Sequence, residues 1–364
     1  MPGVFDADTH IAESEAMWSF IDKEMYPRRP VLARIPEDTW YHERNAFWLI
    51  DGEIFPKPAG KASFSLITPS AQKKESGRGD IHLAVRELTD PSARLKDMDK
   101  IGVEVQVIYP TLFLVYLTDE PQLDVALCRA YNRFVANACA KAADRLKWVV
   151  ILPLRDIAAS LEEMKWAKQQ GAVGVFFRGM EGNLTLDNPQ LHPIYALAEQ
   201  LDLTICIHTG SGSRHLMQPF DVERNHTFAH NRVLPVVAFR DLVANRIPEL
   251  FPKLRFGYIE AAASWVPYIW HVLRRSARPD FKTKNPQDLF REYRFWIACE
   301  ADEELPHLLN YIGEDHIVIG SDYGHNDPSK EPDFVRNMRA REDVPAAVIE
   351  KILCDNPRRL YGVN

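Results

Sequence analysis

The sequence predicts an α/β fold, a (β/α)8 TIM barrel in which eight parallel strands alternate with helices. Eight short apolar, β-branched runs are separated by longer segments in which apolar residues recur at helical spacing. No Gly-x-Gly-x-x-Gly motif follows the first run, which removes the main support for an open dinucleotide-binding sheet. Eight alternating units then fit a closed barrel better than an open sheet.

The first predicted strand opens the chain, and the other seven follow from residue 103 onward. Each run is apolar along its length instead of alternating, which is typical of a parallel strand buried on both faces. The eight runs are Gly3–Ala7, Val103–Tyr109, Trp148–Leu154, Ala172–Phe177, Leu203–His208, Arg255–Glu260, Arg294–Cys299 and His316–Ser321. Helical spacing between them is found at Leu123–Ala143, Ser160–Gln170, Leu191–Leu201 and Asp302–Tyr311.

A long insertion separates the first two predicted strands. The helix before the second strand reads as Pro91–Lys100, with Asp90 as its N-cap, so residues 11–90 lie outside the barrel pattern. Within them, residues 58–80 are rich in Gly, Pro and Lys and predict an exposed loop. We therefore expect a single domain over residues 1–364, in which residues 11–90 cap the site or join subunits.

Composition excludes several classes of protein. Of the 364 residues 46% are hydrophobic and 26% are charged, as in an ordinary globular protein, and the net charge of −7 without a basic block argues against nucleic-acid binding. No apolar run is long enough for a transmembrane helix, and the first residues do not resemble a secretory signal. The five cysteines are widely spaced, which predicts buried free thiols and a cytoplasmic protein.

Polar residues gather where the predicted strands end. Asp8 and His10 close the first strand, His208 the fifth, Glu260 the sixth and Asp322 the eighth. Because catalysis in such barrels sits at the C-terminal ends of the strands, we expect these side chains on one face. Asp8 and His10 are two residues apart, so an extended strand points both the same way. With His208 and Asp322 they form a mixed N/O ligand set suited to zinc, manganese or iron(II).

Taken singly, each of these signals has a structural explanation. An Asp-x-Asp-x-His motif alone is weak evidence for a metal, and a strand-end histidine is more often structural. The Gly-Ser-Asp that ends in Asp322 would also serve as a helix cap. The evidence for a metal site is that these groups occur together at the ends of strands one, five and eight, and the eight strands were counted without reference to them.

At this point the sequence resembles the amidohydrolase superfamily, and within it the amidohydrolase-2 branch that contains the aminocarboxymuconate-semialdehyde and resorcylate decarboxylases. The resemblance extends from Asp6 to Tyr361, and the order of its motifs is more specific than any one of them. It is carried by Asp6–His10, Arg94–Thr111, Ile207–Gly210, Ile259–Pro267, Ile319–His325 and Ile352–Tyr361.

The resemblance implies a ligand set. The family's first-strand motif is His-x-His, and here Asp8 takes the first position, as in many decarboxylating members, while His10 keeps the second. His208 matches the strand-five ligand and Asp322 the strand-eight ligand. Glu260 stands where the family has a strand-six histidine, and we carry it over as a site residue. The family's carbamylated strand-four lysine is absent, which implies one divalent metal ion, zinc or manganese first and iron third.

The function that follows is non-oxidative decarboxylation of a small carboxylic acid. In this interpretation Asp322, His208 and Glu260 are catalytic, and Asp322 or Glu260 handles the proton. Arg178, at the end of the fourth strand, would clamp a substrate carboxylate, although a structural ion pair is an equal alternative. Trp48 and Tyr323 are the other predicted substrate-binding residues.

Three alternatives use the same fold. Hydrolysis of a C–N, C–O or C–C bond would employ the same ligands. A dinuclear non-heme iron oxygenase would draw on Glu260 and on loop histidines, His226, His230 or His325. A non-catalytic subunit of a heteromer is the third. For the enzyme we expect a small acidic substrate and a homodimer, with a heteromer left open.

Overall fold

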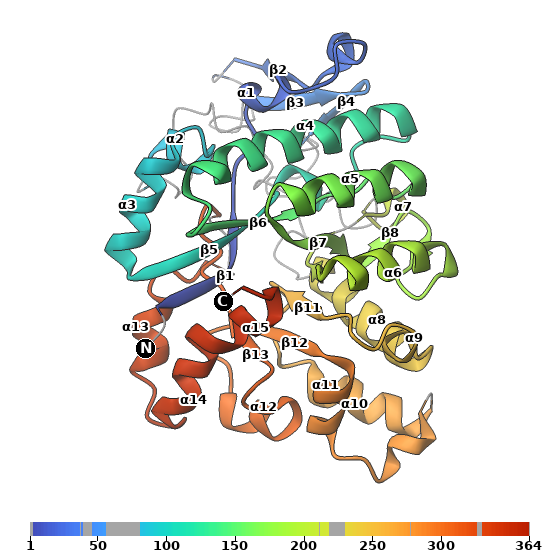
Figure 1. Ribbon diagram of the computed structural model, residues 1–364, viewed down its shortest axis with the longest axis vertical. Coiled ribbons are helices and arrows are strands. Elements are labelled where there is room, and N and C mark those ends of the chain that lie inside the picture. Colours follow the sequence, from blue (N-terminus) through green and yellow to red (C-terminus); the bar gives the residue numbers. More distant parts are fainter. Residues whose placement is uncertain are drawn as a thin grey trace.

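The computed structural model describes residues 3–36, 38, 46–55, 81–210, 212–217, 230–276, 278–325 and 330–363. It confirms the predicted barrel: eight parallel strands are hydrogen-bonded in the order β1-β5-β6-β7-β10-β11-β12-β13. Helices surround these strands (Figure 1). The strands are β1 (Val4–His10), β5 (Val103–Tyr109), β6 (Leu146–Val150), β7 (Ala172–Arg178), β10 (Thr204–His208), β11 (Phe256–Ile259), β12 (Phe295–Cys299) and β13 (Ile317–Ile319).

The barrel closes just beyond the end of β13. There the Asp322 amide donates to the Asp8 carbonyl at 3.1 Å, and the His10 amide donates to the Tyr323 carbonyl at 2.7 Å. One level below, the buried Asp6 carboxylate accepts from the Ser321 amide at 2.8 Å and from the Ser321 hydroxyl. Closure therefore joins two segments that carry predicted ligands.

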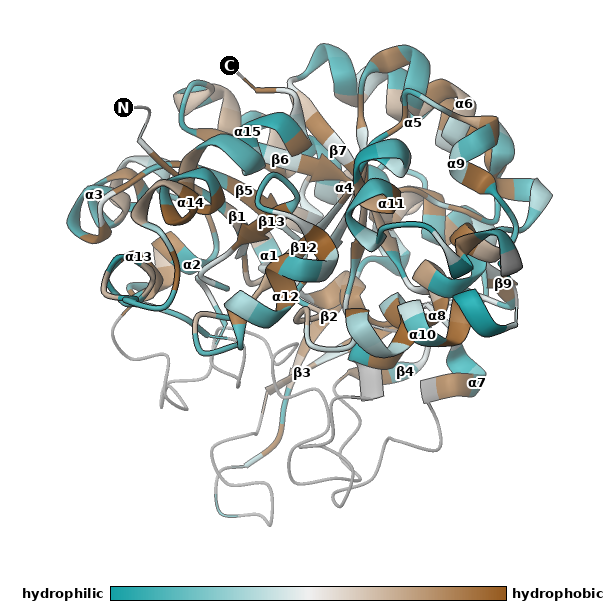
Figure 2. Cartoon of the chain, turned by 90° about the horizontal axis from the view of Figure 1, so that it is seen from below, coloured by the Kyte–Doolittle hydropathy of each residue, from teal (hydrophilic) through white to brown (hydrophobic). Residues whose placement is uncertain are grey.

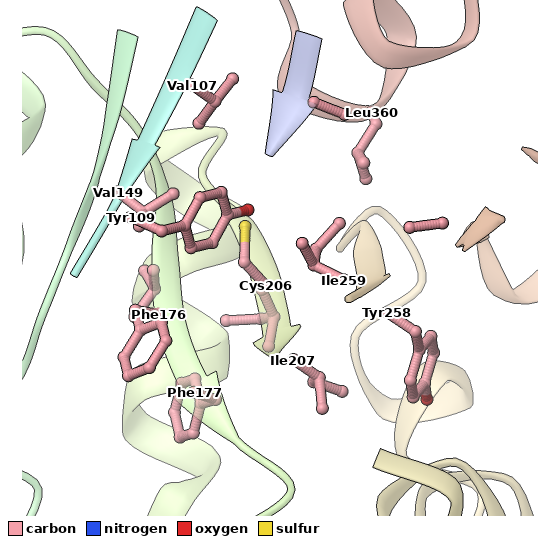
Figure 3. Packing of buried hydrophobic residues seen from close by; sticks show 14 of the residues in the cluster. Val107, Tyr109, Val149, Phe176, Phe177, Cys206, Ile207, Tyr258, Ile259 and Leu360 are labelled. Carbon is pink, nitrogen blue, oxygen red and sulfur yellow. The ribbon is translucent and has the colours of Figure 1, made fainter. Parts of the chain in front are cut away.

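The barrel interior is filled by apolar side chains. Figure 3 shows Tyr109, Phe176, Cys206 and Ile259 pointing into the space between the strands. The Tyr109 hydroxyl lies 2.7 Å from that of Tyr361. All five cysteines are buried and free, as predicted.

The helices predicted from periodicity are present, with shifted ends. The side chain of Asp90 caps the helix that begins at Pro91, accepting from the Ala93 amide at 3.1 Å. Figure 2 shows largely hydrophobic strands among helices whose residues change between hydrophobic and hydrophilic around each helix. The helices are α1 (Glu15–Trp18), α2 (Leu83–Arg86), α3 (Pro91–Ile101), α4 (Pro121–Cys139), α5 (Ile157–Gln169), α6 (His192–Leu201), α7 (Arg214–Met217), α8 (His230–Ala244), α9 (Ile247–Leu250), α10 (Val266–Arg275), α11 (Pro286–Tyr293), α12 (Leu305–Ile312), α13 (Phe334–Arg339), α14 (Ala346–Glu350) and α15 (Asn356–Tyr361). Among the described residues no helix has the length and apolarity that a bilayer crossing requires.

The insertion after β1 folds around a small antiparallel sheet of β2 (Val31–Arg34), β3 (Ala46–Ile50) and β4 (Glu53–Phe55). Figure 2 shows this sheet on the side of the barrel opposite to the two chain ends. β1 runs toward the side that carries the sheet. The Thr118 hydroxyl, in the loop after β5, donates to Asp51 at 2.6 Å and ties the sheet to the barrel. A second small sheet pairs β8 (Met180–Glu181) with β9 (Leu184–Thr185). The predicted loop at 58–80 lies outside the described residues.

Candidate metal centre

The structure brings the five predicted strand-end residues together. Asp8 and His10 come from β1, His208 from the end of β10, and Glu260 and Asp322 from the first turns after β11 and β13. Their side chains are almost completely buried. His10 Nε2 lies 3.3 Å from Asp8 Oδ1 and 3.5 Å from both Glu260 Oε2 and Asp322 Oδ1. His208 Nε2 lies 3.5 Å from Asp8 Oδ1 and 3.3 Å from Glu260 Oε2.

Backbone carbonyls fix which nitrogen each histidine presents. His10 Nδ1 lies 2.8 Å from the Pro110 carbonyl, and His208 Nδ1 lies 2.9 Å from the Thr209 carbonyl. A carbonyl only accepts, so both Nδ1 atoms carry a proton, and Nε2 is the nitrogen that each ring directs into the cluster, where it can bind a proton or a metal ion. Neither Nε2 atom, nor Asp8 Oδ1, has a hydrogen-bond partner among the residues that the structure describes.

The buried carboxylates of this cluster need a positive charge to balance them. Burial lowers the pKa of His10, but the Asp8 and Glu260 carboxylates outweigh it and raise that pKa to about 10. Burial raises the pKa of Asp8, but His208 and His10 reverse this and hold it well below its usual range. Ligand atoms about 2.1 Å from one cation are separated by about 3.0–3.4 Å, close to the separations seen here. The cluster therefore fits a divalent metal ion, with oxygen and nitrogen ligands only.

The backbone at two of these residues is strained. Glu260 has φ 51° and Asp322 has φ 50°, so both lie in the left-handed region that favours glycine. Such strain costs about 1–3 kcal/mol per residue and persists where the surroundings over-determine the conformation, often at functional sites. Beyond Glu260, the buried Glu303 carboxylate accepts from the Ala263 and Ser264 amides at 2.9 and 2.7 Å and holds the turn.

His325 belongs to the same cluster. Its Nδ1 lies 2.7 Å from Asp322 Oδ1, and its ring stacks on His10 with centroids 3.7 Å apart. His10, Glu260, Asp322 and His325 form a second candidate ligand group that overlaps the group of Asp8, His10, His208 and Glu260. Because His10 has one lone pair to offer, it binds one ion only, which favours a single metal over two that share it. His226 lies outside the described residues, as does the side chain of His230, the first residue of α8.

The three predicted substrate-binding residues have internal partners instead. Arg178 Nε lies 3.1 Å from Glu181 Oε1, and its Nη1 donates to two backbone carbonyls after β5. The Tyr323 hydroxyl donates to Asp97 at 2.9 Å, so that side chain extends toward α3. Trp48 is buried in the insertion, perpendicular to Trp18. These contacts match the structural ion pair that was the equal alternative for Arg178, although Arg178 also lines the cavity described below. A substrate-binding role for Arg178, Tyr323 and Trp48 stays a prediction.

Two further residues, Thr111 and Glu13, are connected to the cluster, although neither is among the site residues predicted from the sequence. The Thr111 hydroxyl lies 2.8 Å from His325 Nε2. The Glu13 carboxylate accepts from the Thr111 and Leu112 amides at 2.9 and 2.8 Å. Thr111 lies two residues beyond the end of β5, so the strand-end rule that found His208 would also have found it.

A cavity of about 480 Å³ opens near this cluster. Apolar side chains such as Phe113, Leu152 and Phe176 line it together with charged ones, among them Arg155 and Arg178. None of the five cluster residues is part of its lining. The Phe176 ring lies 5.9 Å from the His208 ring, centroid to centroid, so one wall of the cavity adjoins the cluster. The volume is within the range of small-molecule sites, about 300–1,000 Å³.

Comparisons with known proteins identify the family and agree with the fold. The family profile described as amidohydrolase matches residues 6–363. A gamma-resorcylate decarboxylase from Rhizobium sp. (strain MTP-10005) is 26% identical over 301 residues, which is 77% of this chain and 89% of that protein.

Two solved structures share the fold. An amidohydrolase from Mycobacterium avium subsp. paratuberculosis K-10 is 19% identical, with a TM-score of 0.75 and 99% of each chain covered. The 5-carboxyvanillate decarboxylase from Novosphingobium aromaticivorans DSM 12444, complexed with manganese and 4-hydroxy-3-methoxy-5-nitrobenzoic acid, is 18% identical. Its TM-score is 0.71, with 100% of this chain and 96% of that chain covered.

Proposed function

The chain belongs to the amidohydrolase family, and from that premise we propose that it is a metal-dependent enzyme that decarboxylates a small aromatic carboxylic acid. The observation that carries this proposal is the cluster of Asp8, His10, His208, Glu260 and Asp322, in which buried carboxylates and histidine lone pairs face one another at the C-terminal rim of the barrel. The decarboxylase relative supports the reaction, and the apolar side chains in the lining of the cavity suit an aromatic ring.

Asp8, His10, His208 and Asp322 would hold the metal ion. Glu260 would lie beside it, because its carboxylate converges with Asp8, His10 and His208, while Asp322 reaches the same group through His10, 3.5 Å away. Oxygen and imidazole ligands without sulfur suit manganese or zinc, with iron as the third candidate. When bound, the ion would neutralise the carboxylates of the cluster and attract the carboxylate of the substrate.

The proposed reaction takes up one proton. The bond between the ring carbon and the carboxylate breaks, its electron pair stays on the carbon, carbon dioxide leaves, and a proton completes a new C–H bond. Asp322 or Glu260 would deliver that proton, since both are buried carboxyl groups in the cluster. The turns that fix their left-handed backbone would keep these carboxyl groups in place.

The proposal extends from the site to the organisation of the whole chain. Residues 1–364 would form one catalytic domain in which the insertion at 11–90 covers the rim, consistent with the β2–β4 sheet on that side (Figure 2). We further propose a homodimer that works in the cytoplasm, where five buried free thiols would stay reduced.

Metal analysis combined with a product assay tests this function. Purified protein should contain about one manganese or zinc ion per chain. Hydroxylated benzoates, beginning with gamma-resorcylate, should yield carbon dioxide and the decarboxylated arene in equal amounts, measured by headspace analysis and NMR. Asp322→Asn should abolish this release, and the exposed Asp302→Asn should not.

Other results would replace the proposal. A product that has gained the elements of water, without carbon dioxide, would establish hydrolysis. Stoichiometric oxygen consumption with two iron ions per chain would establish an oxygenase. Metal-free protein that stays inactive with every added divalent ion would favour the non-catalytic subunit.

A further inference from the structure

His325 is wedged between three strand ends. It is 1% exposed and lies in the loop after β13, where its ring stacks on His10 of β1. Thr111, after β5, lies against one ring nitrogen, and Asp322 lies against the other. Before it, Gly324 has φ 104°, and a side-chain carbon there would lie 2.7 Å from the His10 carbonyl oxygen. The backbone thus packs directly on β1 and places the ring.

Hydrogen-bond direction fixes the orientation of this ring. The Thr111 hydroxyl donates its single proton to the Ile11 carbonyl at 2.6 Å. It must therefore accept from His325 Nε2, 2.8 Å away, and the Nε2 atom carries a proton. Nδ1 is then turned toward Asp322 Oδ1, 2.7 Å away. A carboxylate only accepts, so Nδ1 carries a proton as well, and the ring forms an ion pair with Asp322.

Thr111 is itself held in place. Its amide and that of Leu112 donate to the two oxygens of the buried Glu13 carboxylate. A continuous line of contacts thus runs from Glu13 through Thr111 and His325 to Asp322, and it joins the ends of β1, β5 and β13.

We propose that His325 is a positioning residue of the metal centre: Thr111 holds its ring, and its Nδ1 edge holds the carboxylate of Asp322 against the cluster. This inference rests on the proposed function, because it takes Asp322 to be a ligand. It assigns no ligand role to His325 itself. Partners of ligating groups typically change metal affinity by about 10–100-fold when they are removed.

Cobalt(II) binding to metal-free protein tests this without a substrate. Thr111→Val removes the hydroxyl at constant shape, Thr111→Ser keeps it, and His325→Phe keeps the stacked ring but removes both nitrogens. We expect Thr111→Val to weaken cobalt binding by about tenfold and Thr111→Ser to leave it within about twofold. His325→Phe should weaken binding by at least as much as Thr111→Val.

The double variant Thr111→Val/His325→Phe is decisive. If Thr111 acts through His325, adding Thr111→Val to His325→Phe changes the cobalt affinity no further. At saturating cobalt each variant should also keep the wild-type visible spectrum, because the ligands are unchanged. Circular dichroism confirms folding, and His325→Asn replaces His325→Phe if the latter does not fold.

Three results would overturn the inference: wild-type affinity in Thr111→Val, full additivity in the double variant, or a changed saturated spectrum in His325→Phe, which would make His325 a ligand. If the wild-type protein binds cobalt and releases carbon dioxide in any of these cases, the proposed function stands. If the wild-type protein gives no cobalt spectrum, the proposed metal centre fails as well.

Discussion

Two groups of charged side chains lie on the same rim of the barrel and are neutralised in different ways. At the end of β7, Arg178 and Glu181 pair with each other and with backbone carbonyls. Beside it, Asp8, Asp322 and Glu260 meet the nitrogens of His10 and His208, whose Nδ1 protons point away from the cluster. The first group is complete within the chain, whereas the second needs a cation from outside.

The difference shows how a structural charge can be told from a functional one. Strand-end position identifies Arg178 and Asp322 equally well from the sequence. Only the partners separate them, because Glu181, three residues further along in β8, folds back onto Arg178. A buried ion pair with satisfied hydrogen bonds has a structural explanation, whereas converging acceptors remain costly until a ligand joins them.

The largest effect is expected at Asp322. Asp322→Asn removes a carboxylate from the cluster and should lower kcat for decarboxylation by a factor of about 10²–10⁴, the range for a lost proton-transfer group. Asparagine tolerates the left-handed backbone of this position, so unfolding should stay cooperative. Steady-state kinetics and thermal unfolding measure the two effects. Full activity in this variant would move the proton role to Glu260.

The Arg178–Glu181 pair should respond in stability, not in metal binding. Glu181→Gln leaves the guanidinium without its partner carboxylate and should lower the free energy of unfolding by about 3 kcal/mol, the lower end for a broken buried pair. Arg178→Lys keeps the charge but loses the planar fork, and should cost about 1–3 kcal/mol. Urea unfolding and metal analysis test both variants. A loss of substrate affinity at unchanged stability would restore the substrate clamp.

Metal removal should act on the cluster and leave the Arg178–Glu181 pair unchanged. Because the cluster is short of positive charge, a divalent ion at 100 times its Kd should stabilise the fold by about 2.7 kcal/mol. Chelated protein should therefore melt at a lower temperature, and manganese or zinc should restore the melting temperature. Glu181→Gln protein should show the same metal-dependent increase as the wild type. In His208→Ala protein the increase should be smaller, and an undiminished one would place the ion elsewhere.

The fold was accessible from the sequence because most barrel strands are short, largely apolar runs, such as Trp148–Leu154 and Ala172–Phe177. The ligand-type residues followed because parallel strands end on one rim. Side-chain direction beyond the strands did not follow. Tyr323 pairs through its backbone with Thr9, and its side chain turns to Asp97. The left-handed φ of Glu260 and the Thr111–His325 contact depend on turns that no local pattern in the sequence specifies.

Glu13 is a third kind of buried charge, beside the Arg178–Glu181 pair and the metal cluster, because backbone amides are its main partners. Burial raises its pKa to about 7, although the hydrogen bonds from the Leu112 and Thr111 amides oppose the increase. The folded state therefore favours the protonated carboxyl more than the unfolded chain does. This contribution to stability is complete below the unfolded pKa of 4.5 and is lost as the pH rises through about 7.

Glu13→Gln should remove that part of the pH dependence. Each unit of pKa displacement corresponds to about 1.4 kcal/mol, so the wild-type protein should lose of the order of 2 kcal/mol from Glu13 between pH 5 and 8. The variant pays a constant cost, because its amide group meets a backbone N–H, and its disadvantage should shrink as the pH rises. Urea unfolding from pH 5 to 8 measures this, with the exposed Glu342→Gln as the matched control. Parallel curves for wild type and Glu13→Gln would mean that Glu13 is ionised throughout, in which case the two amides alone balance its burial.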